Sequence, residues 1–146
     1  MKYYPYENFK NDTKRLIDKT REFNPHAIVA IARGGLTLAH AMAEGLGIRE
    51  VQTLRTELYD KANKRDCLTI FGECSFDDLK RILVVDDISD SGKTLKEVMK
   101  FLAGGNNSVE FKSATLFYKK TSIYEPHFWV NEADDWIDFF WESDFS

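Results

Sequence analysis

The feature that most constrains this chain is a run of four apolar residues that leads directly into two acids. Residues 82–85 read Ile-Leu-Val-Val, and Asp86 and Asp87 follow without a break. A continuous apolar run of this length suits a strand covered on both faces, as in a parallel sheet. Two carboxyls at the end of such a strand are costly unless cations or hydrogen-bond donors meet them. The run therefore predicts a buried strand that ends at a polar site.

Strand-like and helix-like segments alternate along the rest of the chain. Strands are predicted at residues 27–32, 50–59, 67–71, 111–118 and 128–130, and helices at residues 8–23, 36–46 and 94–102. This alternation predicts an α/β fold with a mostly parallel sheet, and 146 residues suffice for one domain. Ligands bind such sheets at the carboxyl ends of the strands. Residues 33–35, residues 86–94 and Lys119 follow strands and are expected to face one crevice.

Composition and charge narrow the class of protein. Cys67 and Cys74 are the only cysteines, too few for a disulfide framework. No run of about 18 apolar residues occurs, so no membrane span is expected. The first ten residues lack the apolar region of a signal peptide, which makes a cytoplasmic location the expectation. The net charge of −4 argues weakly against a nucleic-acid partner.

The residues after the two acids add an anion site. Residues 90–94 read Asp-Ser-Gly-Lys-Thr and open a predicted helix. Backbone N–H groups at a helix N-terminus bind anions, and Gly92 lets a phosphate approach closely. Asp86 and Asp87 suit a sugar diol or Mg²⁺, so a ribose phosphate fits both halves of the segment. Because side chains alternate along a strand, the two carboxyls are expected to point into different layers.

Other readings of this segment fit less well. A Walker A loop needs glycine five residues before Gly92, where Asp87 stands. No G-x-G-x-x-G follows a strand, so the dinucleotide fingerprint is absent. A phosphoacceptor receiver domain places its acidic pair after the first strand, not in mid-chain. A plain capped turn between strand and helix explains neither the two acids nor the hydroxyls.

Residues 82–94 resemble the phosphoribosyl pyrophosphate (PRPP) binding motif of type I phosphoribosyltransferases. Residues 33–35, Arg-Gly-Gly, resemble the pyrophosphate loop of that family. Trp136-Ile137, then Trp141-Glu142, together with Lys119 at a strand end, resemble bacterial xanthine-guanine phosphoribosyltransferases. The resemblance extends from about residue 27 to residue 142. It implies the type I phosphoribosyltransferase fold: one domain over residues 1–146, with a parallel core flanked by helices and a small hood built from the terminal segments.

The resemblance implies a salvage reaction in which a 6-oxopurine and PRPP give a nucleoside 5′-monophosphate and pyrophosphate. The implied PRPP-binding residues are Arg33, Gly34, Gly35, Asp86, Asp87, Asp90, Ser91, Gly92, Lys93 and Thr94. Asp86 and Asp87 are also the implied Mg²⁺ ligands, and the family often has a cis peptide at the pyrophosphate loop. Arg33, Asp90 and Tyr59 are the implied catalytic residues, with Asp90 near the purine N7 as general base or proton relay.

The implied purine site combines four residues from different segments. Lys119 donates to the purine O6 and so selects 6-oxopurines over adenine. Trp136 stacks on the base, the Ile137 backbone reads its edge, and Glu142 accepts from a 2-amino group. Among the other tryptophans, Trp129 is expected in the core, whereas Trp141 suits either core or site.

The sequence departs from the family pattern at two places. The mobile catalytic loop usually carries a Ser-Tyr pair, and the matching residues here are Leu58 and Tyr59, with Lys61, Lys64 and Arg65 beyond them. Glu142 is one methylene longer than the aspartate expected there, which leaves the ranking of guanine, xanthine and hypoxanthine open. The resemblance also implies a homodimer or homotetramer.

Three alternative functions stay open at this point. The first is a phosphoribosyltransferase for another base, although Lys119 and Trp136 argue against it. The second is a PRPP-sensing regulatory protein without catalysis, which a basic nucleic-acid face would favour. The third is a plain phosphosugar-binding module.

Overall fold

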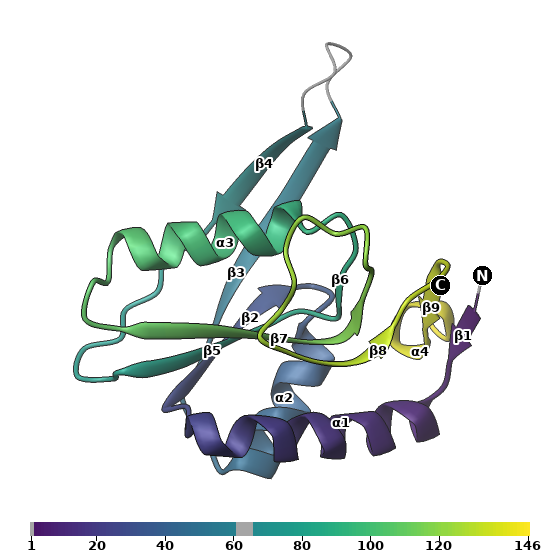
Figure 1. Ribbon diagram of the computed structural model, residues 1–146, viewed down its shortest axis with the longest axis horizontal. Coiled ribbons are helices and arrows are strands. Elements are labelled where there is room, and N and C mark those ends of the chain that lie inside the picture. Colours follow the sequence, from purple (N-terminus) through teal and green to yellow (C-terminus); the bar gives the residue numbers. More distant parts are fainter. Residues whose placement is uncertain (1, 61–65) are drawn as a thin grey trace.

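Figure 1 shows a twisted central sheet with helices on both faces. The structure, a computed structural model, describes residues 2–60 and 66–146. The strands of the sheet are β2 (Ala27–Ala32), β3 (Val51–Asp60), β4 (Asp66–Phe71), β5 (Arg81–Val85), β6 (Ile88–Ser89), β7 (Glu110–Tyr118) and β8 (Phe128–Glu132). Their order is β4-β3-β2-β5-β7-β6, and β8 also pairs with β7. Every pair is parallel except β3 with β4, as the alternation predicts.

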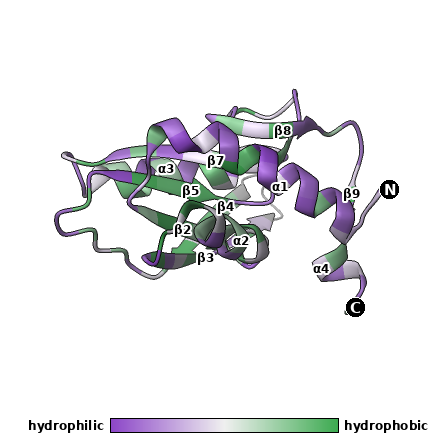
Figure 2. Cartoon of the chain, turned by 90° about the horizontal axis from the view of Figure 1, so that it is seen from below, coloured by the Kyte–Doolittle hydropathy of each residue, from purple (hydrophilic) through white to green (hydrophobic). Residues whose placement is uncertain are grey.

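The helices bury both faces of the central strands. Helices α1 (Tyr6–Thr20) and α2 (Leu36–Leu46) cover one face, and α3 (Lys93–Gly104) covers the other. On β5, Leu83 packs in the α1 and α2 core, whereas its neighbour Val84 packs in the α3 core. Figure 2 shows hydrophobic residues along these strands, whereas α1 is mostly hydrophilic. The apolar runs are therefore continuous because each strand has two buried faces.

A second, two-stranded sheet joins the two ends of the chain. Its strands are β1 (Lys2–Tyr4) and β9 (Ile137–Phe139), and we call it the terminal sheet. The strands are parallel, with Tyr4 opposite Phe139, and helix α4 (Phe140–Ser143) follows β9 directly. Figure 1 shows this sheet beside the carboxyl end of β7. It is built from terminal segments, and its role as the expected hood stays a prediction.

The segment around Tyr59 differs from the sequence expectation. Strands are expected at residues 50–59 and 67–71, and each extends one residue further toward the other: β3 continues to Asp60, β4 begins at Asp66, and Tyr59 pairs with Cys67. The pairing forms a long hairpin that projects beyond α3 (Figure 1). Lys61, Lys64 and Arg65 lie outside the described residues. Within residues 2–60 and 66–146, the helices are all too short or too polar to cross a bilayer.

Candidate functional site

The two aspartates after β5 are buried, and their carboxyls interact. Asp86 and Asp87 are each 9% exposed. The Asp87 N–H donates to Asp86 Oδ1 at 2.8 Å, and the Ile88 N–H donates to Asp87 Oδ1 at 2.7 Å. Of the two, only Asp87 lines a cavity of the site, and the expectation that the carboxyls point into different layers stays a prediction. The site thus contains a close pair of carboxyls.

Burial makes the charged form of this pair costly. It raises the pKa of Asp87 to about 6, and the nearby Glu142 carboxylate acts in the same direction. Burial, and then the charge of Asp87, raise the pKa of Asp86 well above its ordinary value. A cation that binds both carboxylates would offset this cost. The pair is therefore suited to a ligand that brings positive charge.

The loop after β2 lies against the same carboxyls. The Ala32–Arg33 peptide bond is cis, as the resemblance implies. A Cβ built on Gly34 would lie 2.5 Å from Asp87 Oδ2, and one built on Gly35 would lie 2.5 Å from the Val85 carbonyl oxygen. Only glycine allows this close approach. Arg33 itself is exposed, and its guanidinium is available beside the loop.

Replacing Gly34 with alanine is therefore expected to displace the Asp87 carboxyl. The affinity for PRPP, the ligand expected at this edge, should fall about tenfold because the crowded carboxyl must move. Isothermal titration calorimetry measures the affinity. Gly104→Ala is the matched control, since a Cβ on Gly104 meets nothing within 4 Å. An unchanged affinity for Gly34→Ala would contradict the assigned role of this loop.

Residues 90–94 form an open turn at the start of α3. Gly92 is the N-cap residue of the helix and adopts φ +87, a conformation that favours glycine. The Ser91 hydroxyl accepts the Lys93 N–H at 3.3 Å, and the Ile123 N–H donates to the Ser91 carbonyl at 2.9 Å. This packing fixes the turn at the N-terminus of α3. The turn therefore has the geometry of an anion site.

A cavity lies between this turn and the terminal sheet, and we call it the first cavity. It is lined by all four residues predicted from the sequence to bind the purine, together with two of the aspartates predicted to bind PRPP, Asp87 and Asp90. Its lining consists of Asp87, Ile88, Asp90, Lys119, Asp135, Trp136, Ile137, Phe139 and Glu142. Trp136 is 62% exposed, so one face of its ring is open to a ligand. The cavity thus joins polar groups at strand ends to an aromatic wall.

Opposite charges meet on one wall of the first cavity. Lys119 Nζ lies 3.3 Å from Asp90 Oδ1. Lys119 is placed by β7, and its N–H donates to the Ser89 carbonyl at 3.1 Å. A purine carries O6 and N7 on the same edge of the ring. A donor and an acceptor this close together can therefore contact both atoms at once.

The terminal sheet presents a backbone edge to the same cavity. The Trp136 carbonyl accepts the Lys2 N–H at 2.9 Å, and Lys2 is the register partner of Ile137. In a parallel pair, a residue bonds to the two neighbours of its register partner and not to the partner itself. The N–H and C=O of that partner therefore point away from the pairing strand. Ile137 therefore has its backbone groups free of β1 and directed toward the first cavity, which it lines.

A second cavity begins where the first one ends. It is lined by Arg33, Gly34, Leu36, Thr37, Trp141, Glu142, Phe145 and Ser146. Glu142 lines both cavities, so an elongated ligand can extend from one to the other. Trp141 stacks on Phe139 with ring centroids 4.6 Å apart, and its indole N–H has no partner among the described residues. Trp141 is thus both a core residue and a wall of the site.

Seven of the residues predicted for the site line neither of these two cavities: Gly35, Tyr59, Asp86, Ser91, Gly92, Lys93 and Thr94. Tyr59 is half exposed on the β3–β4 hairpin, where its hydroxyl donates to Glu57, and it lines neither cavity. Lys93 lines a separate hollow with Leu58 and Lys96. Trp129 was expected in the core. It lies on β8, is half-buried, and its ring packs against Tyr118 of β7. The catalytic role of Tyr59 stays a prediction.

Sequence reasoning also missed residues of the site. Asp135, Ile88 and Phe139 line the first cavity, and Thr37 lines the second. Asp135 immediately precedes Trp136, and its Oδ1 accepts the Trp136 N–H at 2.7 Å. An acid beside an aromatic residue in an acidic tail is a weak signal, so only the fold identifies it.

The chemistry of the donor set fits Mg²⁺ that arrives with a phosphate ligand. Among the described residues, no group of three or more His, Cys, Asp or Glu side chains is arranged to hold a metal. Mg²⁺ commonly binds one or two carboxylates and takes its other ligands from water and substrate phosphates. Asp86 and Asp87 provide two carboxylates beside the anion turn, which matches that need.

Comparisons with known proteins agree with this geometry. A family model described as the phosphoribosyl transferase domain matches residues 2–145. The chain is 30% identical over 118 residues to a xanthine-guanine phosphoribosyltransferase of Idiomarina loihiensis, covering 79% of this chain and 70% of that protein.

Solved structures extend the similarity to the whole chain. A xanthine-guanine-hypoxanthine phosphoribosyltransferase of Helicobacter pylori superposes with a TM-score of 0.92 at 36% identity, covering 99% of this chain and 95% of that one. A purine phosphoribosyltransferase of Pyrococcus horikoshii superposes with a TM-score of 0.82 at 30% identity, covering 96% and 92%. These similarities confirm the fold predicted from the sequence.

Proposed function

Since the chain belongs to the phosphoribosyl transferase domain family, we propose that it is a purine salvage enzyme that joins a 6-oxopurine to PRPP. The products are the nucleoside 5′-monophosphate and pyrophosphate. The observation that carries this proposal is the first cavity, in which the Lys119–Asp90 pair faces the exposed ring of Trp136. The names of the relatives, which act on guanine, xanthine or hypoxanthine, support it.

Base recognition in this proposal uses three walls of the first cavity. Trp136 stacks on the purine, and Lys119 donates to O6. Asp90 accepts at N7, and the Ile137 backbone and Glu142 read the opposite edge. An amino group at position 6 would bring one donor against another, so adenine is disfavoured.

The reaction is a displacement at C1 of PRPP. The purine N9 forms a bond to C1 as the bond from C1 to pyrophosphate breaks, and Asp90 takes the proton that the base loses at N7. The charge that develops on pyrophosphate is met by Arg33 and by the Gly34 and Gly35 amides. The 5′-phosphate binds the turn from Ser91 to Thr94. The protein thus acts by orientation and by fixed charges.

Asp86 and Asp87 would hold Mg²⁺ and the ribose hydroxyls in this scheme. When bound, Mg²⁺ neutralises charge on the leaving pyrophosphate. The chain's own contribution is to keep the two carboxylates close together at the end of β5. Their raised pKa values mean that cation binding is weakened as the pH falls toward 6.

Replacing Trp136 with alanine is expected to raise the KM for the base about tenfold, because one stacking surface is lost. The KM for PRPP should change less than twofold. Steady-state kinetics with hypoxanthine and guanine measure both constants. Trp129→Ala is the matched control, since Trp129 lines neither of the two cavities. Equal increases in both KM values would argue against a stacking role.

The direct test combines the protein, Mg²⁺ and PRPP with guanine, xanthine, hypoxanthine, adenine, orotate or uracil. Release of nucleotide and pyrophosphate with 6-oxopurines alone is the expected result. Turnover only with adenine or a pyrimidine would replace this proposal with transfer to another base. PRPP binding without turnover would favour a regulatory PRPP sensor.

Assembly and location complete the proposal. A homodimer or homotetramer is expected, and light scattering during size-exclusion chromatography tests it. A cytoplasmic location is expected, and fractionation of cells that express the tagged chain tests that part.

A further inference from the structure

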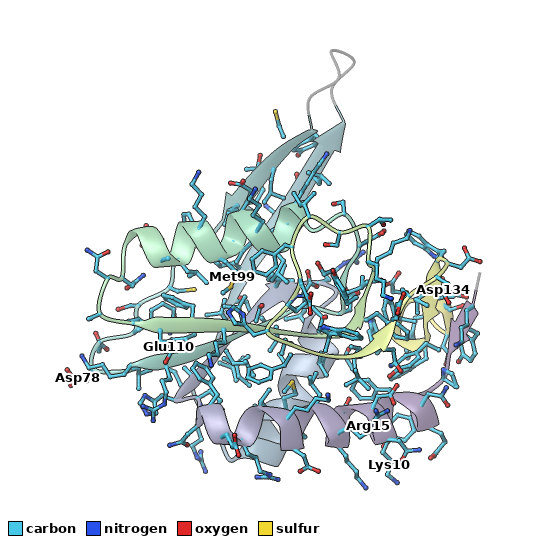
Figure 3. All side chains as sticks on the ribbon, viewed as in Figure 1. Lys10, Arg15, Asp78, Met99, Glu110 and Asp134 are labelled. Atoms are coloured by element: carbon cyan, nitrogen blue, oxygen red, sulfur yellow. The ribbon has the colours of Figure 1, made fainter. Side chains whose placement is uncertain are left out.

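A partly buried polar network connects α1 to two different strands, and we call it the Asp12 network. The Tyr4 hydroxyl donates to Asp12 Oδ2 at 2.7 Å, and the Asn131 amide donates to the same oxygen at 2.8 Å. Tyr4 is 3% exposed, and Asp12 and Asn131 are half-buried. Arg15, labelled on α1 in Figure 3, lies 3.7 Å from the other Asp12 oxygen. One carboxylate therefore links β1 to β8.

The Tyr4 side of the network holds the aromatic wall of the first cavity. Tyr4 is the register partner of Phe139, and its ring meets the Phe139 ring edge-on at 5.7 Å. Two residues earlier on the same strand, the Lys2 N–H holds the Trp136 carbonyl. The position of β1 therefore determines where Trp136 and Ile137 lie.

The Asn131 side holds the opposite wall. Asn131 on β8 pairs with Phe117 on β7, and the Ala133 N–H donates to the Tyr118 carbonyl at 2.9 Å. Lys119 follows Tyr118 directly and pairs with Asp90 across the cavity wall. The position of β8 against β7 is thus coupled to the strand end that carries Lys119.

From these connections we propose that the Asp12 network sets the separation between the Trp136 wall and the Lys119 wall, which makes Tyr4 and Asn131 positioning residues for the purine. The proposal rests on the proposed function only for the identity of the ligand. A flat base needs stacking and an in-plane hydrogen bond at once, so a change in this separation weakens one of them. Apolar packing is not directional, whereas the two hydrogen bonds to Asp12 Oδ2 fix the orientation of β1 and β8.

The test replaces Tyr4 with phenylalanine, which keeps the ring and removes the bond to Asp12. The KM for hypoxanthine is expected to rise about fivefold, because one net hydrogen bond is lost. The KM for PRPP and kcat should stay within twofold. Tyr6→Phe is the matched control, because it removes the same atom from a ring that is 53% exposed. A hypoxanthine KM within twofold of the wild type would overturn the proposal.

A double variant separates positioning from general loosening. Tyr4→Phe and Asn131→Ala break the same connection, so the double variant should raise the hypoxanthine KM no more than the larger single effect. Additive increases, or a parallel rise in the KM for PRPP, would show that the two residues act only on overall packing and would overturn the proposal.

Hydrogen exchange of the ligand-free protein tests the network without any base. Tyr4→Phe should speed exchange in peptides that cover β1 and β9 and leave peptides that cover residues 86–94 unchanged. Unchanged exchange in β1 and β9 would overturn the proposal even if no base proves to be a substrate. A wild-type protein without purine turnover would instead contradict the proposed function.

Discussion

Replacing Asp87 with asparagine is expected to lower turnover at least about 100-fold while it raises the melting temperature of the ligand-free enzyme at pH 8. Activity falls because a carboxylate proposed to bind the metal and the ribose is lost. Asparagine can still accept the Ile88 N–H that now donates to Asp87 Oδ1 at 2.7 Å. Steady-state kinetics and differential scanning calorimetry measure the two effects.

The rise in stability follows from the sign of the pKa shift. Burial raises the pKa of Asp87 to about 6 in the folded protein, against about 4 in an unfolded chain. Between these values the folded state binds more protons, so the contribution of Asp87 to stability is lost as the pH rises through 6. The charged carboxyl therefore destabilises the ligand-free enzyme at pH 8, and a neutral amide relieves this. At pH 4 the difference in melting temperature should nearly disappear.

Asp78→Asn is the matched control for charge removal. Asp78 lies in the connection between β4 and β5, at the end of the molecule opposite the terminal sheet (Figure 3). It is exposed, so its removal should change turnover less than twofold at either pH. If Asp87→Asn melts at a lower temperature than the wild type at pH 8, buried charge is not the dominant effect in the pair.

Replacing Lys119 with alanine is expected to lower kcat/KM for hypoxanthine and guanine about 100-fold. The variant lacks the donor proposed for the purine O6. It also lacks the ammonium group that lies 3.3 Å from Asp90 Oδ1 in the wild type. Both side chains are more than a third exposed, so stability should change little. Discrimination against adenine should fall, because the donor that disfavours a 6-amino group is gone. Competition between hypoxanthine and adenine measures this ratio.

Lys120→Ala provides the control for the lysine pair. Lys120 lies on the surface 3.5 Å from Glu132 and lines neither cavity. Its removal should change kcat/KM less than twofold. Should the two lysine variants lose activity equally, the effect would be one of general charge, and the assignment of Lys119 to the purine O6 would be wrong.

The parts of the fold that the sequence predicts are those with two buried faces. Residues 27–32 and 82–85 carry continuous apolar runs, residues 111–118 are mostly apolar, and each segment forms a strand of the central sheet. β1 and β9 have three residues each and pair across more than 130 positions. Neither has a periodic pattern, and each is a strand only because the other is present. Local pattern therefore could not identify them.

The site divides in the same way. The anion turn at residues 90–94 is local, so its residues and spacing predict its geometry. The lining of the first cavity combines Lys119 just after β7, Trp136 just before β9 and Glu142 of α4, which only the family resemblance could bring together. The interaction between the Asp86 and Asp87 carboxyls was not predicted, because it depends on where β5 ends. Tyr59 was expected at the site, but strand pairing with Cys67 places it on the hairpin.

The pairing of β1 with β9 also determines the order in which the two parts of the site form during synthesis. A ribosome extends the chain from its N-terminus, so residues 86–94 emerge well before residues 136–142. Until β9 emerges, β1 has no strand to join, and the aromatic wall of the first cavity does not exist. A nascent chain can therefore acquire its anion turn while it still lacks a place for a base. During synthesis the chain therefore becomes able to bind the phosphate part of the ligand before it becomes able to bind the base.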